Sequence, residues 1–266
     1  MIARVRRHAL DVYALLALGY LFLPIAIVIV FSFNNPLGRF NYTWSGFTMK
    51  NWEDPLAYPG LGSAIRVSLE IAFLSALVST ILGTLIALAL VRYRFRGSGT
   101  TNLLIFVPMT TPEIVLGASL LTLFLNWKVP QGFGTILIAH IMFNISYVVV
   151  TVRARLVGFD RHLEEAAMDL GANEVVTFFR VTLPLIAPGV LAAGLLAFAL
   201  SVDDFVITYF NAGTVTTFPL FVWGAARVAV PPQINVVGTA IFVVAVGGML
   251  ANVLWQNRRA KRLATA

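Results

Sequence analysis

The sequence predicts an all-α, polytopic membrane protein with six transmembrane helices, and three observations support this. Hydrophobic residues make up 59% of the 266 residues and charged residues only 12%, whereas soluble domains carry about 25% charged residues. The mean hydropathy is +0.85. Six apolar stretches are each long enough, at about 20 residues, to cross a bilayer as a helix. Because lipid offers the backbone no hydrogen-bond partners, and because the alternation typical of barrel strands is absent, every stretch is expected to be helical.

The six expected spans follow one another in a single transmembrane domain, residues 1–266. They are residues 12–31, 63–91, 102–125, 135–152, 186–210 and 236–255. Three arginines precede the first span, as in a secretory signal, but its apolar run is longer than that of a signal and no small-residue cleavage site follows. The first span is therefore predicted to be a retained helix.

Prolines and small residues distinguish two of these spans. Pro108 and Pro112 leave backbone carbonyls free in the third span, which is tolerated only where a helix faces protein or a water-filled cavity. Gly189, Ala193 and Ala197 recur every four residues in the fifth span and suit close packing of helices. The third span is therefore expected beside a transport pathway, and the fifth in the packed interior.

No metal site is expected. The chain has no cysteine, so thiolate ligands are excluded. His140 and Asn144 lie one turn apart in the fourth span, and such a pair most often forms hydrogen bonds between helices. No further histidine or acid lies nearby in the sequence to complete a ligand set.

Basic residues gather in alternate loops, and this predicts the topology. Fourteen of the 19 lysines and arginines precede the first span, follow the second or fourth span, or close the chain. They are Arg4, Arg6, Arg7, Arg92, Arg94, Arg96, Arg153, Arg155, Arg161, Arg180, Arg258, Arg259, Lys261 and Arg262. The positive-inside rule therefore places both termini in the cytoplasm. Residues 32–62 and 211–235 then form periplasmic loops, and the net charge of +7 needs no nucleic-acid partner.

The one large cytoplasmic loop, residues 153–184, changes from solidly apolar to amphipathic. Apolar residues recur there at helical spacing and define one face of a helix, and acids lie off that face. The apolar set is Leu163, Ala166, Ala167 and Leu170, and the acids are Glu164, Glu165 and Asp169. We name this segment the elbow.

Capping residues predict where the helices of the elbow begin and end. Asp160 is the expected cap of the first helix and Gly171 its stop. A second short helix, capped by Asn173, should run from Glu174 until Pro184 interrupts it. A helix that seeks lipid has basic residues on its polar face and bulky apolar residues on the other. The elbow has acids and alanines instead, which favours a groove on a partner protein over the membrane surface.

The elbow also resembles the loop that is typical of ABC importer permeases. That family's pattern is E-A-A, three residues, G, nine residues and I-x-L-P, and this chain departs from it only by valine at Val181. The resemblance implies that the first elbow helix is a coupling helix, which docks into a cytoplasmic ATPase subunit and transmits its closure. The implied coupling residues are Glu164, Glu165, Ala166, Ala167, Asp169, Gly171, Leu183 and Pro184.

Other segments are similar to the spermidine/putrescine permeases of the PotC type. They are RYRFRG, PMTTPEIVLGASLLTLF, VVVTVRARLVGFD and FALSVDDFVITYF. Relatives that serve ferric iron, sulfate or phosphonates share the general architecture, so these solutes stay open as alternatives.

Four acids fall within the expected spans, where ionisable residues are costly and mark functional sites. These are Glu70, Glu113, Asp203 and Asp204. A polyamine carries several ammonium groups separated by methylenes, so its path should combine carboxylates with aromatic faces. The candidate aromatic residues are Phe205, Tyr209 and Trp223. A structural role is the alternative: Glu70 could pair with Arg66 one turn away, and either aspartate could cap a helix break.

Missing motifs exclude several functions. No G-x-x-x-x-G-K-[S/T] loop occurs, so the chain is not expected to hydrolyse ATP or to act as an enzyme. No cofactor is expected to bind it directly, and ATP with Mg²⁺ would be used by the partner ATPases. An ion-coupled secondary transporter would explain the intramembrane acids but not the elbow. A scaffold protein would explain the elbow but not the acids.

The resemblance implies four partners in a bacterial inner membrane. A homologous second permease would complete the pathway, and the pair could be two different chains or two copies. A pair of ATPase subunits would bind the elbows. A periplasmic or lipid-anchored solute-binding protein would deliver the substrate, and the bilayer itself would surround the multi-pass chain.

Overall fold

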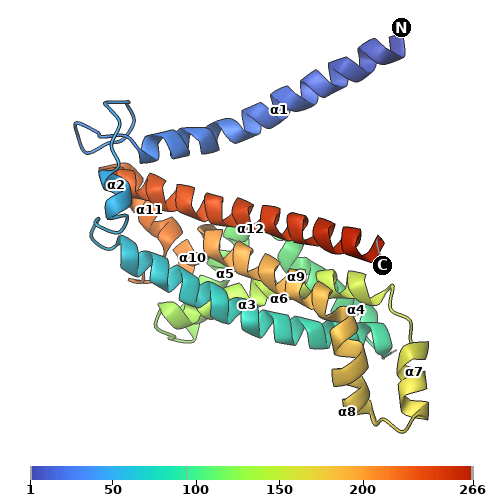
Figure 1. The fold of residues 1–266 in the computed structure, drawn as a ribbon. Helices are drawn as coiled ribbons and strands as arrows, with labels where there is room; N and C mark the ends of the chain where they lie inside the picture. The colour runs from blue at the N-terminus through green and yellow to red at the C-terminus, as the bar shows by residue number, and fades with distance from the viewer. Residues whose placement is uncertain (1, 94, 265–266) are drawn as a thin grey trace. The chain divides into compact units, whose positions relative to one another are not determined.

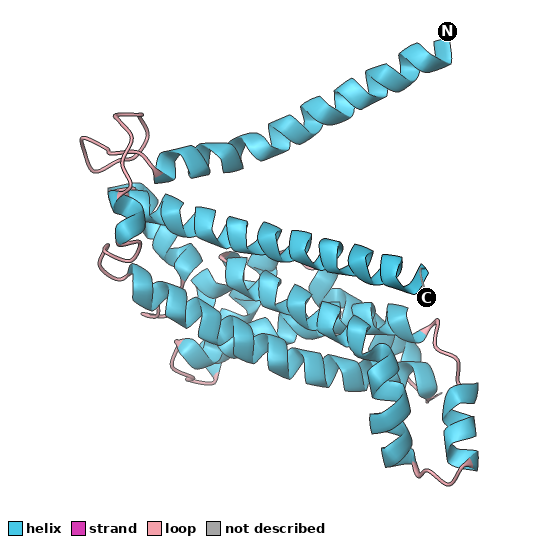
Figure 2. Cartoon of the chain, in the orientation of Figure 1, coloured by secondary structure: helices cyan, strands magenta, loops and turns pink. Residues whose placement is uncertain are grey.

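The computed structural model describes the backbone of residues 2–93 and 95–264 and the side chains of residues 10–93 and 95–251. Over this part of the chain the regular elements are all helices (Figure 2). The predicted basic clusters at the two termini, together with Arg94, lie outside the described side chains. The chain divides into two compact units, Met1–Gly62 with Val222–Ala266, and Ser63–Phe221.

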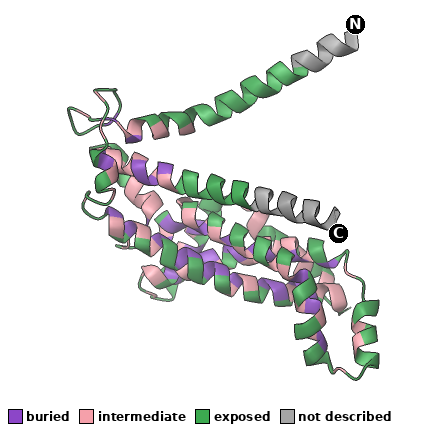
Figure 3. Ribbon diagram, in the orientation of Figure 1, coloured by how far each residue is buried: buried purple, intermediate pink, exposed green. Residues whose placement is uncertain are grey.

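The first unit contains the first and last long helices. α1 (Ile2–Ser32) contacts α12 (Pro232–Ala264), and the short α2 (Lys50–Glu53) lies in the loop after α1. Three buried asparagines organise this loop: Asn34 donates to Asn41 Oδ1 at 2.6 Å, and Asn51 donates to the carbonyl of Asn34 at 2.8 Å. Most of α1 from Leu10 onward is exposed (Figure 3), as expected of a helix that faces lipid.

The second unit contains the remaining membrane helices and the elbow (Figure 1). Its elements are α3 (Leu61–Arg92), α4 (Ser98–Thr110), α5 (Glu113–Asn126), α6 (Phe133–Leu156), α7 (His162–Asp169), α8 (Glu174–Thr177), the π-helical turn η1 (Phe178–Thr182), α9 (Leu183–Asp203) and α10 (Val206–Asn211). A further apolar helix, α11 (Phe218–Val228), crosses the boundary between the units.

Small residues let α9 pack closely on α6, as the sequence predicts. Ala193 and Ala197 are fully buried in one apolar cluster with Val148 and Val152 of α6. At Gly189 an added Cβ would lie 2.8 Å from Cβ of Arg155, closer than two carbon atoms can approach. The four-residue ridge is therefore confirmed as a packing surface.

The third predicted span is not one helix, which corrects the prediction of a continuous helix over 102–125. Within the described residues, five helices are long and apolar enough to cross a membrane. A sixth span results if α4 and α5 count as one, although they are bent by 107°. Thr111 is extended with ψ 131°, and Pro112 stands immediately before α5. A proline disfavours the helical region for the preceding residue, and here the helix ends and restarts in a new direction.

The fifth predicted span differs at both ends. At its C-terminal end α9 stops at Asp203, Asp204 is extended, and the chain resumes as α10. At its N-terminal end the apolar helix is continuous from Glu174 to Asp203, so the predicted interruption at Pro184 is wrong. The Leu183 amide bonds to the carbonyl of Phe178, five residues back, just before Pro184. This π-helical turn gives room to a ring that would clash in a regular α-helix.

Candidate functional site

The elbow is a pair of helices that meet at Gly171. The amides of Gly171 and Ala172 bond to the carbonyls of Met168 and Ala167, at 2.9 and 3.1 Å. This is a Schellman motif, in which the residue after the helix adopts a left-handed conformation that favours glycine. Gly171 has φ +90°, so the predicted stop is confirmed.

The predicted cap at Asn173 is confirmed, whereas the N-cap of α7 is Arg161, one residue after the predicted Asp160. The carboxylate of Asp160 accepts the backbone amide of His162 at 3.0 Å, at the start of α7. The side chain of Asn173 accepts the amide of Val176 at 2.9 Å, at the start of α8. Each of these side chains supplies an acceptor to an amide that the helix itself leaves without one.

The orientation of α7 differs from the sequence prediction in one respect. Glu165 and Asp169 are exposed, as expected, but Glu164 turns inward and its side chain is only 14% exposed. The apolar residues Leu163 and Leu170 are 47% and 90% exposed. Helical periodicity predicts which residues share a face of the helix, but not which face packs against the rest of the chain. The chain therefore leaves an acidic and apolar face of α7 uncovered.

The start of α7 should respond to pH through the exposed pair of Asp160 and His162, whose Oδ1 and Nδ1 atoms are 2.7 Å apart. Side-chain and backbone hydrogen bonds from His162 lower the pKa of Asp160, and the hydrogen bond with Asp160 raises the pKa of His162. The pKa of His162 is higher in the folded state than in the unfolded state. The pair's contribution to the stability of the folded state is therefore complete below about pH 6.5 and is lost as the pH rises through the raised pKa.

We therefore expect the first amides of α7 to be better protected from hydrogen exchange at about pH 6 than at about pH 8, after correction for intrinsic rates. His162→Gln should remove this difference. The amides of α8, capped by the non-titrating Asn173, serve as the internal control. Equal pH dependence in the variant and the parent chain would contradict this assignment.

A second cluster lies where α9 breaks, and Asp204 is its centre. The Asp204 carboxylate accepts the amides of Ile207 and Thr208, at 3.3 and 2.8 Å, and therefore caps α10. It also accepts the Thr208 hydroxyl at 2.8 Å and lies 3.1 Å from His140 Nε2. The structural alternative for this aspartate, the cap of a helix break, is confirmed.

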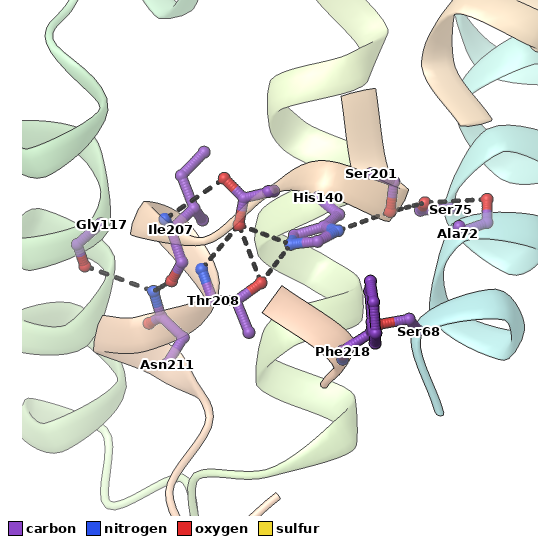
Figure 4. Close-up of polar contacts among 11 residues, drawn as sticks. Ser68, Ala72, Ser75, Gly117, His140, Ser201, Ile207, Thr208, Asn211 and Phe218 are labelled. Atoms are coloured by element: carbon purple, nitrogen blue, oxygen red, sulfur yellow. Dashed lines mark hydrogen bonds and ion pairs between the residues drawn. The ribbon is translucent and has the colours of Figure 1, made fainter. Parts of the chain in front are cut away.

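The hydrogen bonds around His140 extend to α3 (Figure 4). His140 Nδ1 lies 2.6 Å from the Ser201 hydroxyl, which is 3.0 Å from the hydroxyl of Ser75. If Nε2 carries the proton and donates to Asp204, Nδ1 accepts from Ser201, and Ser201 in turn accepts from Ser75. Every member then has a partner, so this network fixes α3, α6 and the helix break together.

The predicted hydrogen bonds between helices are confirmed for His140 but are not found for Asn144 within the described part of the chain. Asn144 is fully buried, and neither polar atom of its side chain has a hydrogen-bond partner among the described residues. The partners of His140 are instead 61 to 68 residues away in the chain. Sequence spacing within one helix could not indicate them.

The two helix breaks bring three predicted acids together. Glu113 begins α5, Asp203 ends α9, and both are exposed. The carboxylate of Glu113 interacts electrostatically with those of Asp204 and Asp203. Asp204 is engaged in the cap, whereas the carboxylates of Glu113 and Asp203 are exposed.

Aromatic rings adjoin these acids, as predicted. Phe205 follows Asp204 directly, and its ring centroid lies 5.6 Å from that of Tyr209, which is 58% exposed. The hydroxyl of Tyr147 in α6 also interacts electrostatically with Glu113. Tyr147 was not among the predicted residues, although it lies seven residues after His140 and hence on the same helical face.

The other two predicted pathway residues have partners of their own. Arg66 Nε lies 3.5 Å from Glu70 Oε1, and both side chains are more than half exposed. The guanidinium carbon of Arg227 lies 4.6 Å from the ring of Trp223, in the first unit. The alternative of a pair with Arg66 is thus observed for Glu70, and pathway roles for Glu70 and Trp223 stay predictions.

Comparison with protein families gives one decisive match. Residues 79–262 match the family described as the inner membrane component of binding-protein-dependent transport systems. The chain belongs to this family. The matched region of this transport component includes the elbow, both helix breaks and the His140 network apart from Ser75.

Individual relatives extend the likeness over most of this ABC importer permease. The chain is 40% identical to the spermidine/putrescine transport system permease protein PotC of Escherichia coli K12, over 91% of this chain and 92% of PotC. It is 38% identical to the putrescine transport system permease protein PotI of the same strain, over 95% and 92%.

Solved structures support the fold of the permease. A chain from a bacterial ABC transporter that imports the acidic polysaccharide alginate matches with a TM-score of 0.64 at 18% identity, over 96% of this chain and 95% of that one. A second structure of an alginate transporter, in complex with its alginate-bound periplasmic protein, matches with a TM-score of 0.63 at 16% identity, over 98% and 97%. At such low identity the likeness concerns the ABC permease fold alone.

Proposed function

We propose that this permease transports a polyamine, spermidine or putrescine, across a bacterial inner membrane. The observation that supports this best is the meeting of Glu113 and Asp203 at two helix breaks, beside aromatic rings. A carboxylate attracts an ammonium group, and an aromatic face accepts a cation within about 6 Å. The similarity to PotC and PotI agrees with such a substrate.

The backbone breaks explain how acids are placed at this depth. Helix interruptions within a membrane are tolerated where they line a cavity or are buried in protein. Capping of α10 by Asp204 satisfies the amides that the break sets free. This leaves Asp203 exposed at the end of α9. Its carboxylate can there replace water around an ammonium group of the substrate and contact that group directly.

We further propose that the energy comes from partner chains. ATP and Mg²⁺ are used by a pair of ATPase subunits that bind the exposed face of α7. No cofactor binds the permease directly. A second, homologous permease completes the pathway. Both termini are cytoplasmic, residues 153–184 form the coupling loop of a single domain, and residues 32–62 and 211–235 face a periplasmic or lipid-anchored solute-binding protein.

In this mechanism, closure of the ATPases displaces α7, and the rigid second unit carries that motion to the helix breaks. The apolar core of α6 and α9 and the His140 network link the two ends. Displacement of α7 then changes which side of the membrane can reach Glu113 and Asp203. Such alternating access needs a second state with different contacts.

Reconstitution tests the proposed function. The permease, its partner permease and the ATPases are placed in proteoliposomes with the binding protein, and uptake of labelled putrescine and spermidine is followed. Uptake should require ATP and binding protein, and ferric iron, sulfate and phosphonates should not be transported. Polyamine uptake without nucleotide, or ATP-driven uptake of one of the other solutes instead, would refute the proposal.

A further inference from the structure

We propose that Glu164 is a positioning residue that ties α7 to the C-terminal end of α3, so that displacement of the coupling helix reaches three membrane helices at once. The inference rests on the proposed role of α7 in binding the ATPase. It assigns Glu164 a function different from direct contact with the ATPase, because this side chain faces the rest of the permease.

Three elements meet at the Glu164 carboxylate. Arg92, the last residue of α3, forms an ion pair with Glu164 and also donates to the Thr182 hydroxyl at 3.3 Å. The Thr182 hydroxyl, fully buried in the π-helical turn before α9, donates to the same carboxylate oxygen. Arg92 and Glu164 are 29% and 14% exposed, so water screens their attraction less than at an open surface.

A second contact joins the same two helices. The Arg161 guanidinium, just before α7, donates to the carbonyl of Val91 at 2.8 Å. Arg161 and Glu164 are three residues apart and therefore lie on one side of the helix. Two contacts on one side fix the direction in which α7 faces, not only its distance from α3.

Along the chain, α7 is not covalently connected to α3 by a direct loop. Covalent links join α7 to α6 on one side and to α8 and α9 on the other, whereas Arg92 is 72 residues away from Glu164. The outward face of α7, with Glu165 and Asp169, stays exposed for a partner. Force applied to that face can reach α3 through Arg92 and Arg161.

The test separates coupling from folding by measuring substrate uptake per ATP hydrolysed in the reconstituted importer. Glu164→Gln and Arg92→Gln should each lower this ratio about fivefold or more, the smallest effect typical of coupling between sites. The reversed pair, Arg92→Glu with Glu164→Arg, should recover most of the ratio. Arg96→Gln is the matched control, because it removes an equal charge from an exposed arginine four residues after Arg92.

The outcomes decide between the proposals. If the wild-type importer shows no ATP-dependent uptake, the proposed function fails. If the wild type is active and Glu164→Gln keeps the wild-type ratio, only the link through Glu164 is wrong. If the single variants do not assemble, the reversed pair must restore both assembly and coupling, and its failure to do so overturns the inference.

Discussion

Gly171→Val should lower ATP-driven uptake about tenfold or more and leave insertion into the membrane intact. Gly171 has φ +90°, and a Cβ added there would meet nothing within 4 Å. The effect therefore comes from the backbone and not from a clash. An L-residue in the left-handed region costs about 1–2 kcal/mol, and a β-branched one costs more. We expect the chain to relieve this strain by a change in the orientation of α7 relative to α8. Uptake should therefore fall about tenfold or more.

Two further substitutions make this test specific to backbone conformation. Gly171→Asn should keep most of the uptake, because asparagine adopts the left-handed conformation more readily than valine. Gly99→Val, in α4, introduces the same side chain where φ is not positive and space is open, and should have little effect. Uptake and the amount of permease in the membrane are measured side by side. Wild-type uptake by Gly171→Val would contradict the coupling role of the elbow.

Combined replacement of Glu113 by Gln and Asp203 by Asn should lower polyamine uptake about tenfold. Both acids are exposed and interact electrostatically, so their neutralisation removes attraction for the substrate. Two charge contacts of roughly 0.7 kcal/mol each account for a change of this size, since about 1.4 kcal/mol corresponds to a factor of ten. Initial uptake of labelled putrescine, at fixed ATP and binding protein, measures it.

Asp204→Asn serves as the contrasting variant. The Asp204 side chain is only 6% exposed, and it accepts the backbone amide of Thr208 at the start of α10. We expect it to lower the thermal stability of the permease, since a weakened buried hydrogen-bond network costs about 1–3 kcal/mol. The Glu113/Asp203 double variant should keep its stability. Unchanged uptake in that double variant would show that these acids do not line the cation path.

Local rules of the backbone explain what the sequence alone determined. The long apolar helices, the stop at Gly171, the cap at Asn173 and the bond from the His162 amide to Asp160 each depend on residues within a few positions of one another. Lipid excludes unpaired backbone groups, and a missing Cβ permits the left-handed turn. Composition and spacing are therefore sufficient for these features.

Proline shows the limit of such local inference. Pro112 ends a helix and turns the chain by 107°, whereas Pro184 sits inside a continuous helix because a π-helical turn precedes it. The outcome depends on which neighbouring residues can bond the freed carbonyls and fill the space around the ring. That information lies in the packing and not in the residue type.

The roles of the acids were decided by tertiary structure. Glu164 and Glu165 are neighbours in the sequence, yet one is tied to Arg92 and the other is exposed. Asp203 and Asp204 divide in the same way, one exposed and one capping a helix beside His140. Helical periodicity fixes the angle between side chains, but the partner that buries one of them lies 64 to 72 residues away. Only the folded chain brings such residues within hydrogen-bonding distance.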